Sequence, residues 1–260
     1  MDGPHRPRKR FGQHFLHDGG VIAKILAVIH PRDGERFVEI GPGLGALSCA
    51  LLPAVGTLDA VELDRDLIPE LERRAAGLGR LRVHHADALG FDLCALASGG
   101  AKLRVVGNLP YNVSTPLLFR LLDQLVCLED MHFMLQKEVA QRLAAGPGSR
   151  SYGRLGIMVQ YKCQVERLFD VGSGAFTPAP RVASSFVRLS PRREPLAYVR
   201  DEACFKRLVT QAFSRRRKTL RNALKGLLSP EQIAAQGVDP AVRPETLSVE
   251  QLARLSNCLE

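Results

Sequence analysis

The chain has 260 residues, of which 45% are hydrophobic, 24% charged and 6% aromatic, and its formal net charge is +9. This composition is typical of a globular protein with a substantial core and argues against extensive disorder. No apolar run approaches the roughly 18–20 residues that a membrane span needs, and residues 1–11 lack the apolar stretch of a secretory signal.

Short apolar runs alternate with helical patterns through most of the chain. We predict strands over residues 36–40, 57–62, 81–83, 103–106 and 132–135, and helices over residues 47–52, 67–76 and 114–125. Because strands that alternate with helices pair in parallel through right-handed crossovers, the pattern predicts an α/β fold with a mostly parallel, doubly wound sheet. Such a sheet binds its ligand at the carboxyl ends of its strands.

Beyond residue 191 the pattern is helical only. The apolar residues of the first helix there fall on one face and are Phe205, Leu208, Val209 and Ala212. We therefore place a domain boundary near residue 190. It separates a larger, ligand-binding domain over residues 1–190 from a small helical domain over residues 191–260.

A glycine-rich turn follows the first predicted strand, with glycine at positions 41, 43 and 45. Glycine lets the backbone turn tightly and lets a ligand approach without a Cβ in the way, so we expect Gly41 and Gly43 to contact the ligand. With Ala46 in the sixth place, the run also satisfies the dinucleotide-binding pattern G-x-G-x-x-G/A. The turn alone therefore leaves open both NAD and S-adenosylmethionine as ligands.

Acidic residues stand at the ends of the next two predicted strands. Glu62 lies 21 residues after Gly41, where its carboxylate would accept hydrogen bonds from a ribose diol. Asp87 follows the third strand and supplies an acceptor suited to an adenine amine. Either carboxylate alone is more simply a solvated loop residue, but three such features at successive strand ends favour one binding site.

The fourth predicted strand leads into Asn108-Leu109-Pro110-Tyr111. The Asn108 side-chain oxygen and a backbone carbonyl directed by Pro110 can accept both hydrogens of a planar exocyclic amine. The nitrogen lone pair is then free to attack an electrophilic methyl group, while Tyr111 offers a ring for stacking, worth roughly 1–3 kcal/mol per base. Such a turn acts by positioning and needs no strong general base. A purely structural turn before the next helix is the alternative.

The positive charge is concentrated in residues 181–228, which carry 13 basic and 3 acidic side chains. The centre of this segment is Arg215, Arg216, Arg217 and Lys218, followed by Arg221. Arg217, Arg221 and Lys225 have the spacing i, i+4 and i+8, which on a helix would form a stripe that follows phosphates. We therefore favour a nucleic-acid-binding surface over a solvated helix face.

The six cysteines are far apart and include no C-x-x-C pair; they are Cys49, Cys94, Cys127, Cys163, Cys204 and Cys258. We expect them to be reduced residues of a cytoplasmic protein rather than disulfide partners or zinc ligands. The histidine pairs of the sequence lack a convincing third ligand, so we expect no metal site.

Five segments together resemble a known family. They are residues 9–16 (KRFGQHFL), the glycine turn, residues 108–111, residues 176–182 (FTPAPRV) and residues 212–224 (AFSRRRKTLRNAL). The chain resembles the KsgA family of S-adenosylmethionine-dependent ribosomal RNA adenine dimethyltransferases over about residues 8 to 255. This resemblance implies a class I methyltransferase domain over residues 1–190 and a basic, RNA-binding helical domain over residues 191–260.

The resemblance also implies a substrate and site residues. The substrate would be two adjacent adenosines near the 3′ end of 16S rRNA, dimethylated at N6 within the immature small ribosomal subunit. Because no obvious dimer helix appears in the sequence, we expect a monomer. Residues implied to contact the methyl donor are His14, Leu16, Gly41, Gly43, Glu62, Asp87 and Asn108. Asn108 and Tyr111 would face the target base, and Phe176 would stack on its other side.

Three other interpretations remain. A related class of enzymes methylates large-subunit rRNA with the same chemistry, although Phe176 and the basic C-terminal segment favour the small subunit. A non-catalytic assembly factor that occupies an immature small subunit is compatible with the same basic segment. An NAD oxidoreductase is disfavoured because the sequence shows no evident acid–base pair for hydride transfer.

Overall fold

The computed structural model describes residues 13–97, 100–214 and 217–259. Within these ranges the chain forms two compact units. The first comprises the described residues up to Ala140 together with Glu166–Pro191, and the second comprises Gln141–Val165 together with the described residues from Arg192 onward. Among the described residues, no helix is both long enough and apolar enough to cross a bilayer.

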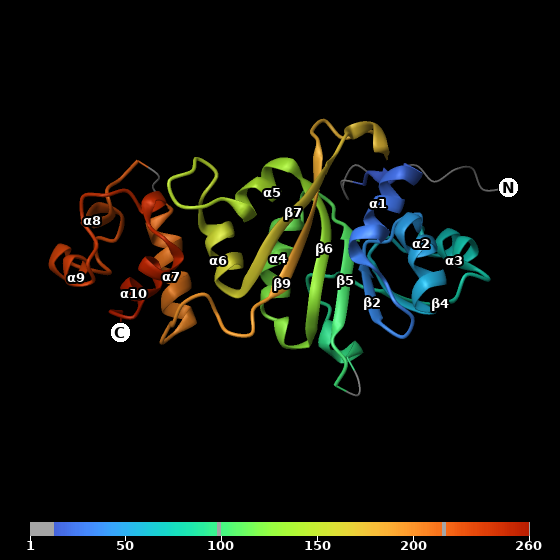
Figure 1. The fold of residues 1–260 in the computed structure, drawn as a ribbon, viewed down its shortest axis with the longest axis horizontal. Helices are drawn as coiled ribbons and strands as arrows, with labels where there is room; N and C mark the ends of the chain where they lie inside the picture. Colours follow the sequence, from blue (N-terminus) through green and yellow to red (C-terminus); the bar gives the residue numbers. More distant parts are fainter. Residues whose placement is uncertain (1–12, 98–99, 215–216, 260) are drawn as a thin grey trace. The chain divides into compact units, whose positions relative to one another are not determined.

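A seven-stranded sheet organises the first unit, with the strand order β4-β3-β2-β5-β6-β9-β7 (Figure 1). The strands are β2 (Arg36–Ile40), β3 (Thr57–Glu62), β4 (Arg80–His85), β5 (Leu103–Asn108), β6 (Leu128–Gln136), β7 (Cys163–Val171) and β9 (Ser184–Pro191). The strands from β4 to β6 are parallel, whereas β9 pairs antiparallel with β6. The predicted mostly parallel, doubly wound sheet is confirmed, and β7 and β9 are strands that the sequence pattern did not predict.

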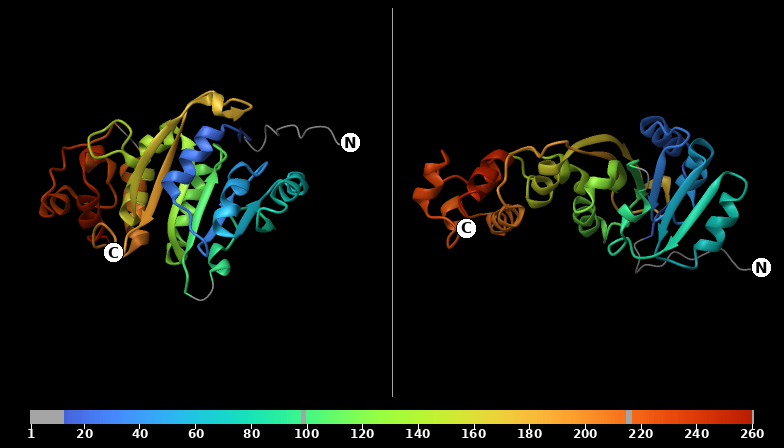
Figure 2. Two further views of the ribbon diagram at one scale, coloured as in Figure 1. Left: turned by 45° about the vertical axis from the view of Figure 1, so that its right-hand side comes forward. Right: turned by 90° about the horizontal axis from the view of Figure 1, so that it is seen from below.

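Helices connect the strands of this unit. They are α1 (Gly19–Ile29), α2 (Ala46–Val55), α3 (Ile68–Ala75), α4 (Ser114–Leu122) and α5 (Lys137–Ala144). Helices α1 and α2 lie side by side, as Figures 1 and 2 show. Helix α1 begins after Asp18, whose Oδ1 accepts a hydrogen bond from the Val21 amide at 3.0 Å. Its buried residues Ile25 and Ile29, one turn apart, pack in one apolar cluster with Phe37 of β2.

The strand order reverses beside β2, because the chain passes from β2 to β3 and β4 on one side and then returns to β5 on the other. Ligands of doubly wound sheets bind at the carboxyl ends of the strands at such a reversal. A short antiparallel pair of β1 (Phe15–Leu16) and β8 (Phe176–Thr177) brings two distant segments together. Residues 173–175 form a 3₁₀ turn directly before β8.

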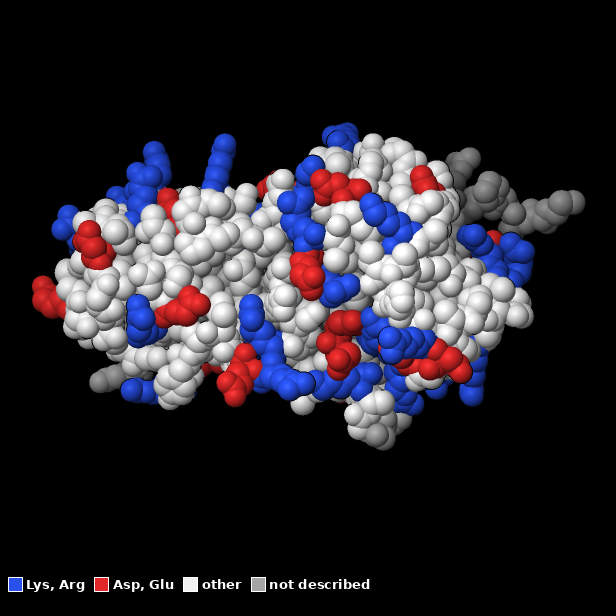
Figure 3. Space-filling model, in the orientation of Figure 1, with Lys and Arg blue, Asp and Glu red and all other residues white. Residues whose placement is uncertain are grey.

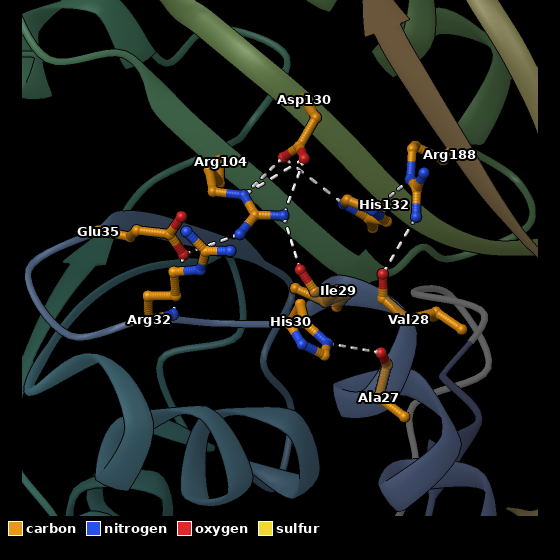
Figure 4. A network of polar contacts seen from close by, with 10 residues as sticks. All are labelled: Ala27, Val28, Ile29, His30, Arg32, Glu35, Arg104, Asp130, His132 and Arg188. Carbon is orange, nitrogen blue, oxygen red and sulfur yellow. Dashed lines mark hydrogen bonds and ion pairs between the residues drawn. The ribbon is translucent and has the colours of Figure 1, made fainter.

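A partly buried arginine joins three elements of the first unit (Figure 4). The Arg104 guanidinium of β5 donates to the Asp130 carboxylate at 2.9 Å and to the Glu35 carboxylate at 2.8 Å. Its Nη2 also donates to the backbone carbonyl of Ile29 at 2.8 Å. The last carbonyls of a helix have no partner within the helix, so Arg104 provides one for the carboxyl end of α1.

A second arginine of the same network, Arg188 of β9, donates from Nη2 to the Val28 carbonyl at 3.1 Å. Its Nε donates to Nε2 of His132, a fully buried residue of β6, at 3.1 Å. Burial, together with a smaller effect of the two nearby arginines, lowers the pKa of His132 to about 4 against the opposing effect of Asp130. His132 is therefore a neutral acceptor near pH 7, and both arginines hold the same end of α1.

The second unit is helical beyond Pro191 in the described residues. Its helices are α6 (Arg154–Lys162), α7 (Glu202–Ala212), α8 (Leu220–Ala223), α9 (Pro230–Ala235) and α10 (Val249–Ser256), with a 3₁₀ turn over Pro244–Thr246. Serine capping boxes begin α9 and α10. The division near residue 190 assigned residues 141–165 to the first domain, but they group with the second unit because α6 packs on α7, with Tyr161 and Phe205 rings 4.9 Å apart.

The basic segment does not form the predicted helical stripe. Helix α7 ends at Ala212, and α8 extends only from Leu220 to Ala223. Arg217 and Lys218 lie in turns between the two helices, so Arg217, Arg221 and Lys225 do not follow one helix face. The expectation of a continuous helix was wrong because a turn interrupts the helical pattern here, while Thr219, in extended conformation, begins α8.

Cys94 and Cys127 form a disulfide, so the expectation that all six cysteines are reduced was wrong for this pair. They lie 33 residues apart, in 3₁₀ turns over Leu93–Leu96 and Leu125–Cys127. The Gln124 side chain fastens these turns together, because its Oε1 accepts from the Leu93 amide at 2.7 Å. Sequence spacing alone carries no signal for such a long-range pair.

Candidate active site

A pocket lies at the carboxyl ends of β2, β3, β4 and β5, and the segment before α1 contributes one wall. Ten of the site residues expected from the sequence line it: His14, Leu16, Gly41, Gly43, Glu62, Asp87, Asn108, Leu109, Pro110 and Tyr111. Residues more than 90 positions apart in the chain therefore meet at one site, which is the edge of the sheet where the fold rule expects a ligand.

The glycine turn after β2 has left-handed backbone conformations, with φ of +66° at Gly41 and +58° at Gly43. Such angles strain residues that carry a Cβ. At Gly43 a Cβ would also lie 3.0 Å from the ring of Phe15, which packs over the turn. The turn thus forms a close cradle that a side chain would fill.

Glu62 is held rigidly at the end of β3. Its Oε2 accepts from the Gly43 amide at 3.1 Å, and its Oε1 accepts from the Asp64 amide at 2.8 Å. The side chain is 6% exposed, and this burial raises the pKa of Glu62 although the backbone hydrogen bonds lower it. The carboxylate joins the end of β3 to the glycine turn. Its fixed position suits it to accept hydrogen bonds from a sugar diol.

Asp87 follows β4 and is exposed. Its Oδ1 accepts from the Leu89 amide at 2.9 Å, which fixes the side chain in a tight turn. The second carboxylate oxygen remains as an acceptor at the pocket wall, as recognition of an adenine amine requires.

The segment before α1 is fastened across the pocket by side-chain hydrogen bonds. Gln13 Nε2 donates to the Asp64 carboxylate at 3.0 Å, and His14 Nδ1 donates to the Pro178 carbonyl at 2.7 Å. The backbone pairing of β1 with β8 adds to these contacts. The N-terminal wall of the pocket is therefore tied to both β3 and the segment after β8.

Asn108, the last residue of β5, has a defined amide orientation. Its Nδ2 donates to the backbone carbonyl of His14 at 2.7 Å. A carbonyl can only accept, so the amide nitrogen must face His14 and Oδ1 must take the opposite direction. The pocket lining thus includes a side-chain acceptor of fixed orientation.

The turn after Asn108 is also fixed by hydrogen bonds. The Pro110 carbonyl accepts from the Val113 and Ser114 amides at 3.2 and 3.1 Å and so begins α4. The Tyr111 hydroxyl is 2.7 Å from Ser184 Oγ, and its ring centroid is 5.4 Å from that of His14. Because the Pro110 carbonyl already accepts these two backbone amides, the Leu109 carbonyl is the candidate for the backbone acceptor of an exocyclic amine.

Phe176 does not line the pocket. Its side chain is 3% exposed and belongs to an apolar cluster with Leu16, its partner across the β1–β8 pair. In this structure the Phe176 ring therefore lies in the core, and its stacking on a base stays a prediction. Tyr111 is the aromatic residue of the expected set that lines the pocket.

Glu39, the last-but-one residue of β2, lines the pocket, and no role was predicted for it. The side chain is 2% exposed and accepts a hydrogen bond from Ser48 Oγ of α2. Burial, against the opposing effect of the Ser48 hydrogen bond and with a smaller contribution from the charge of Glu62, raises the pKa of Glu39 to about 7. Its position two residues before Gly41 places it near the turn but does not reveal its burial.

The basic residues expected to bind RNA are only partly described. Arg217, Lys218 and Arg221 are exposed in the second unit. Arg215, Arg216 and residues 9–12 of the N-terminal motif lie outside the described residues. In the part of Figure 3 that shows the second unit, Lys and Arg side chains project from the surface among scattered acidic ones.

The fold and the pocket together define the class I methyltransferases. A family model described as ribosomal RNA adenine dimethylase matches residues 4–260. The chain therefore belongs to the ribosomal RNA adenine dimethylase family, whose methyl donor is S-adenosylmethionine.

Individual relatives agree with this assignment. Ribosomal RNA small subunit methyltransferase A of Pseudomonas aeruginosa is 57% identical over 255 residues, which cover 98% of this chain and 95% of that protein. A dimethyladenosine transferase from Plasmodium falciparum has a similar structure, with a TM-score of 0.77, 25% identity and coverage of 93% and 96% of the two chains. The 23S rRNA methyltransferase ErmE, at 24% identity and a TM-score of 0.74 over 94% and 99% of the two chains, shares the fold.

Proposed function

We propose that the protein transfers methyl groups from S-adenosylmethionine to N6 of two adjacent adenosines near the 3′ end of 16S rRNA. It would act as a monomer on immature small ribosomal subunits in the cytoplasm. The observation that carries the proposal is the oriented Asn108 amide in the same pocket as the glycine turn, Glu62 and Asp87. The name of the Pseudomonas aeruginosa relative supports the small subunit as the target.

The residues of the pocket fit the methyl donor. Glu62 would hold the ribose hydroxyls, Asp87 the adenine amine, and the glycine cradle at Gly41 and Gly43 the methionine end, with His14 and Leu16 forming the opposite wall. When bound, S-adenosylmethionine supplies a methyl group that its positively charged sulfur already activates. The protein therefore has to bind, orient and exclude water.

The turn after β5 would position the adenine amine. Asn108 Oδ1 and the Leu109 carbonyl accept its two hydrogens, which aims the nitrogen lone pair and stabilises the positive charge that develops on nitrogen. The Tyr111 ring, tethered through Ser184, presents a fixed stacking surface. An adenosine in an RNA loop turns out at low cost because it has no pairing partner to lose.

The second unit would hold the surrounding rRNA. The exposed basic residues there would contact phosphates and fix the register of the RNA without reading bases. The set proposed for this role is Arg215, Arg216, Arg217, Lys218 and Arg221.

Methylation of immature ribosomal subunits tests the proposal. Small and large subunits from cells that lack this modification are incubated with the protein and a methyl-labelled donor, and modified nucleotides are mapped. We expect label in dimethylated adenosines at two adjacent positions near the 3′ end of 16S rRNA. Label in 23S rRNA alone, or no transfer to either subunit, would overturn the proposal.

A further inference from the structure

The titratable groups of the donor pocket are strongly unbalanced in charge. The lining contains four carboxylates and no lysine or arginine among the described residues. The carboxylates are Glu39, Glu62, Asp64 and Asp87, and the other titratable groups of the lining are His14 and Tyr111. An empty pocket of this kind concentrates negative charge, which favours a cationic ligand and penalises full ionisation before that ligand binds.

Glu39 and Glu62 are stabilised very differently in this field. The Glu62 carboxylate accepts two backbone amides, those of Gly43 and Asp64, which support its negative charge. Glu39 is more deeply buried, and it accepts its hydrogen bond from the Ser48 hydroxyl. The charge of Glu62 also opposes ionisation of Glu39. The Cys49 thiol of α2 is a further titratable group near Glu39, and the charge of Glu39 helps to raise the pKa of that thiol.

The methyl donor and its product differ by one unit of charge. S-adenosylmethionine carries a sulfonium, an ammonium and a carboxylate, whereas the demethylated product carries a neutral thioether in place of the sulfonium. A carboxyl group beside the glycine cradle therefore meets a cation before methyl transfer and a neutral ligand after it.

We propose that Glu39 is a charge-matching residue of the donor pocket: it holds a proton when the pocket is empty and releases that proton to solvent when the cationic donor binds. It regains a proton from solvent once the methyl group has left, so the neutral product meets a neutral carboxyl. The inference rests on the proposed function for the identity of the ligand. As a consequence of this proton exchange, the pocket would bind the cationic donor more tightly than the neutral product.

The direction of the pH dependence follows from the burial of Glu39, which raises its pKa to about 7. Donor binding lowers this pKa, so donor affinity should rise as the pH increases from about 6 to about 8. Each unit by which binding lowers the pKa corresponds to a tenfold gain in affinity across that window. The affinity of the neutral product should change much less.

Calorimetric titration without RNA tests the inference. Donor and product are each titrated into the protein at pH 6.5 and 7.0 in two buffers of different ionisation enthalpy, which gives the number of protons released. We expect release of a substantial fraction of one proton on donor binding and little release on product binding.

The variant Glu39→Gln keeps an acceptor for Ser48. It should abolish the proton release attributed to the protein and reduce the preference for donor over product at least several-fold. Equal proton release by Glu39→Gln and the unaltered protein would overturn the proposal.

A second variant keeps the test informative if Glu39→Gln binds poorly. Ser48→Ala removes the hydrogen bond that favours ionised Glu39, so the proton-release window should move to higher pH. Infrared difference spectra should show the band of a protonated carboxyl disappearing when donor binds, and its persistence would contradict the proposal. Failure of the protein to bind donor at all would count against the proposed function, whereas binding without proton release would reject only the role of Glu39.

Discussion

At the scale of single residues, two separate constraints favour glycine at position 43. Its φ of +58° disfavours any residue with a Cβ, and a Cβ there would lie 3.0 Å from the Phe15 ring. Gly34 has φ of +79°, and a Cβ added there would meet no other described atom within 4 Å. The two glycines therefore share the backbone constraint but differ in their surroundings.

Gly43→Ala should weaken donor binding about tenfold or more, because Phe15 would have to leave the cradle at a cost of about 1–3 kcal/mol. Gly34→Ala is the matched control and should lose a similar amount of folding stability with unchanged donor affinity. Calorimetric affinities and melting temperatures of both variants provide the measurements. Equal donor affinities in the two variants would show that the cradle is not part of the donor site.

The site residues that the sequence predicts are those at strand ends. Glu62, Asp87 and Asn108 could be placed because a parallel sheet brings the carboxyl ends of its strands together. The role of Glu39 could not be inferred, because its burial depends on how α2 covers β2. The burial of Phe176 could not be inferred either, since its pairing with Leu16 is a contact over 160 positions that no local pattern reveals.

At the scale of elements, the carboxyl end of α1 is held by Arg188, which is partly buried and hydrogen-bonded to the fully buried His132. The pKa of His132, about 4 in the folded protein, is below its ordinary value of about 6.5. The unfolded chain therefore binds more protons between these values, and the contribution of His132 to stability decreases as the pH falls from about 6.5 to about 4.

His132→Gln should remove this part of the loss of stability on acidification. It amounts to about 3 kcal/mol of unfolding free energy between pH about 6.5 and about 4. Urea denaturation at pH 7.0, 6.0, 5.0 and 4.5 measures it as the difference between the variant and the unaltered protein. His17→Gln, which removes an exposed imidazole, is the control. If the unaltered protein and His132→Gln lost stability in parallel on acidification, His132 would not be the responsible group.

The sequence pattern predicts the strands that are buried on both faces, but it does not predict elements whose pattern is masked by charged residues or interrupted by turns. The strands β2, β3 and β5 are buried along almost their whole length and are rich in apolar residues, because both sheet faces are covered. Strand β7 was missed because its charged residues sit in surface ion pairs, as Asp170 does with Lys137 and Arg167, and so hide the alternation. The basic segment was predicted as one helix since its composition favours helix, but turns interrupt it after Ala212.

At the scale of the whole molecule, the excess of positive charge lies in residues 181–228 and the following residues are acidic on balance. The exposed Arg217 and Lys218 belong to the basic part of the second unit, whereas the exposed Arg243 and Arg254 lie in the acidic part. Removing two positive charges from either place changes the net charge equally.

The double variant Arg217→Ala/Lys218→Ala should bind immature small subunits more weakly and with a smaller salt dependence, because each lost phosphate contact lowers the slope by about 0.7–0.9. Arg243→Ala/Arg254→Ala is the matched control and should bind nearly as the unaltered protein does. Affinities measured over a range of salt concentrations compare the two. The same loss in both variants would indicate a general charge effect rather than a defined interface.

The central claim is that the Asn108 amide, oriented by the His14 carbonyl, accepts the amine of the target adenine. Single-turnover methyl transfer by Asn108→Ala at saturating donor and immature subunits tests it most directly, with RNA and donor affinities measured in parallel. We expect the rate to fall about 10²–10³-fold while RNA binding is retained. A rate within a few-fold of the unaltered protein would contradict the claim.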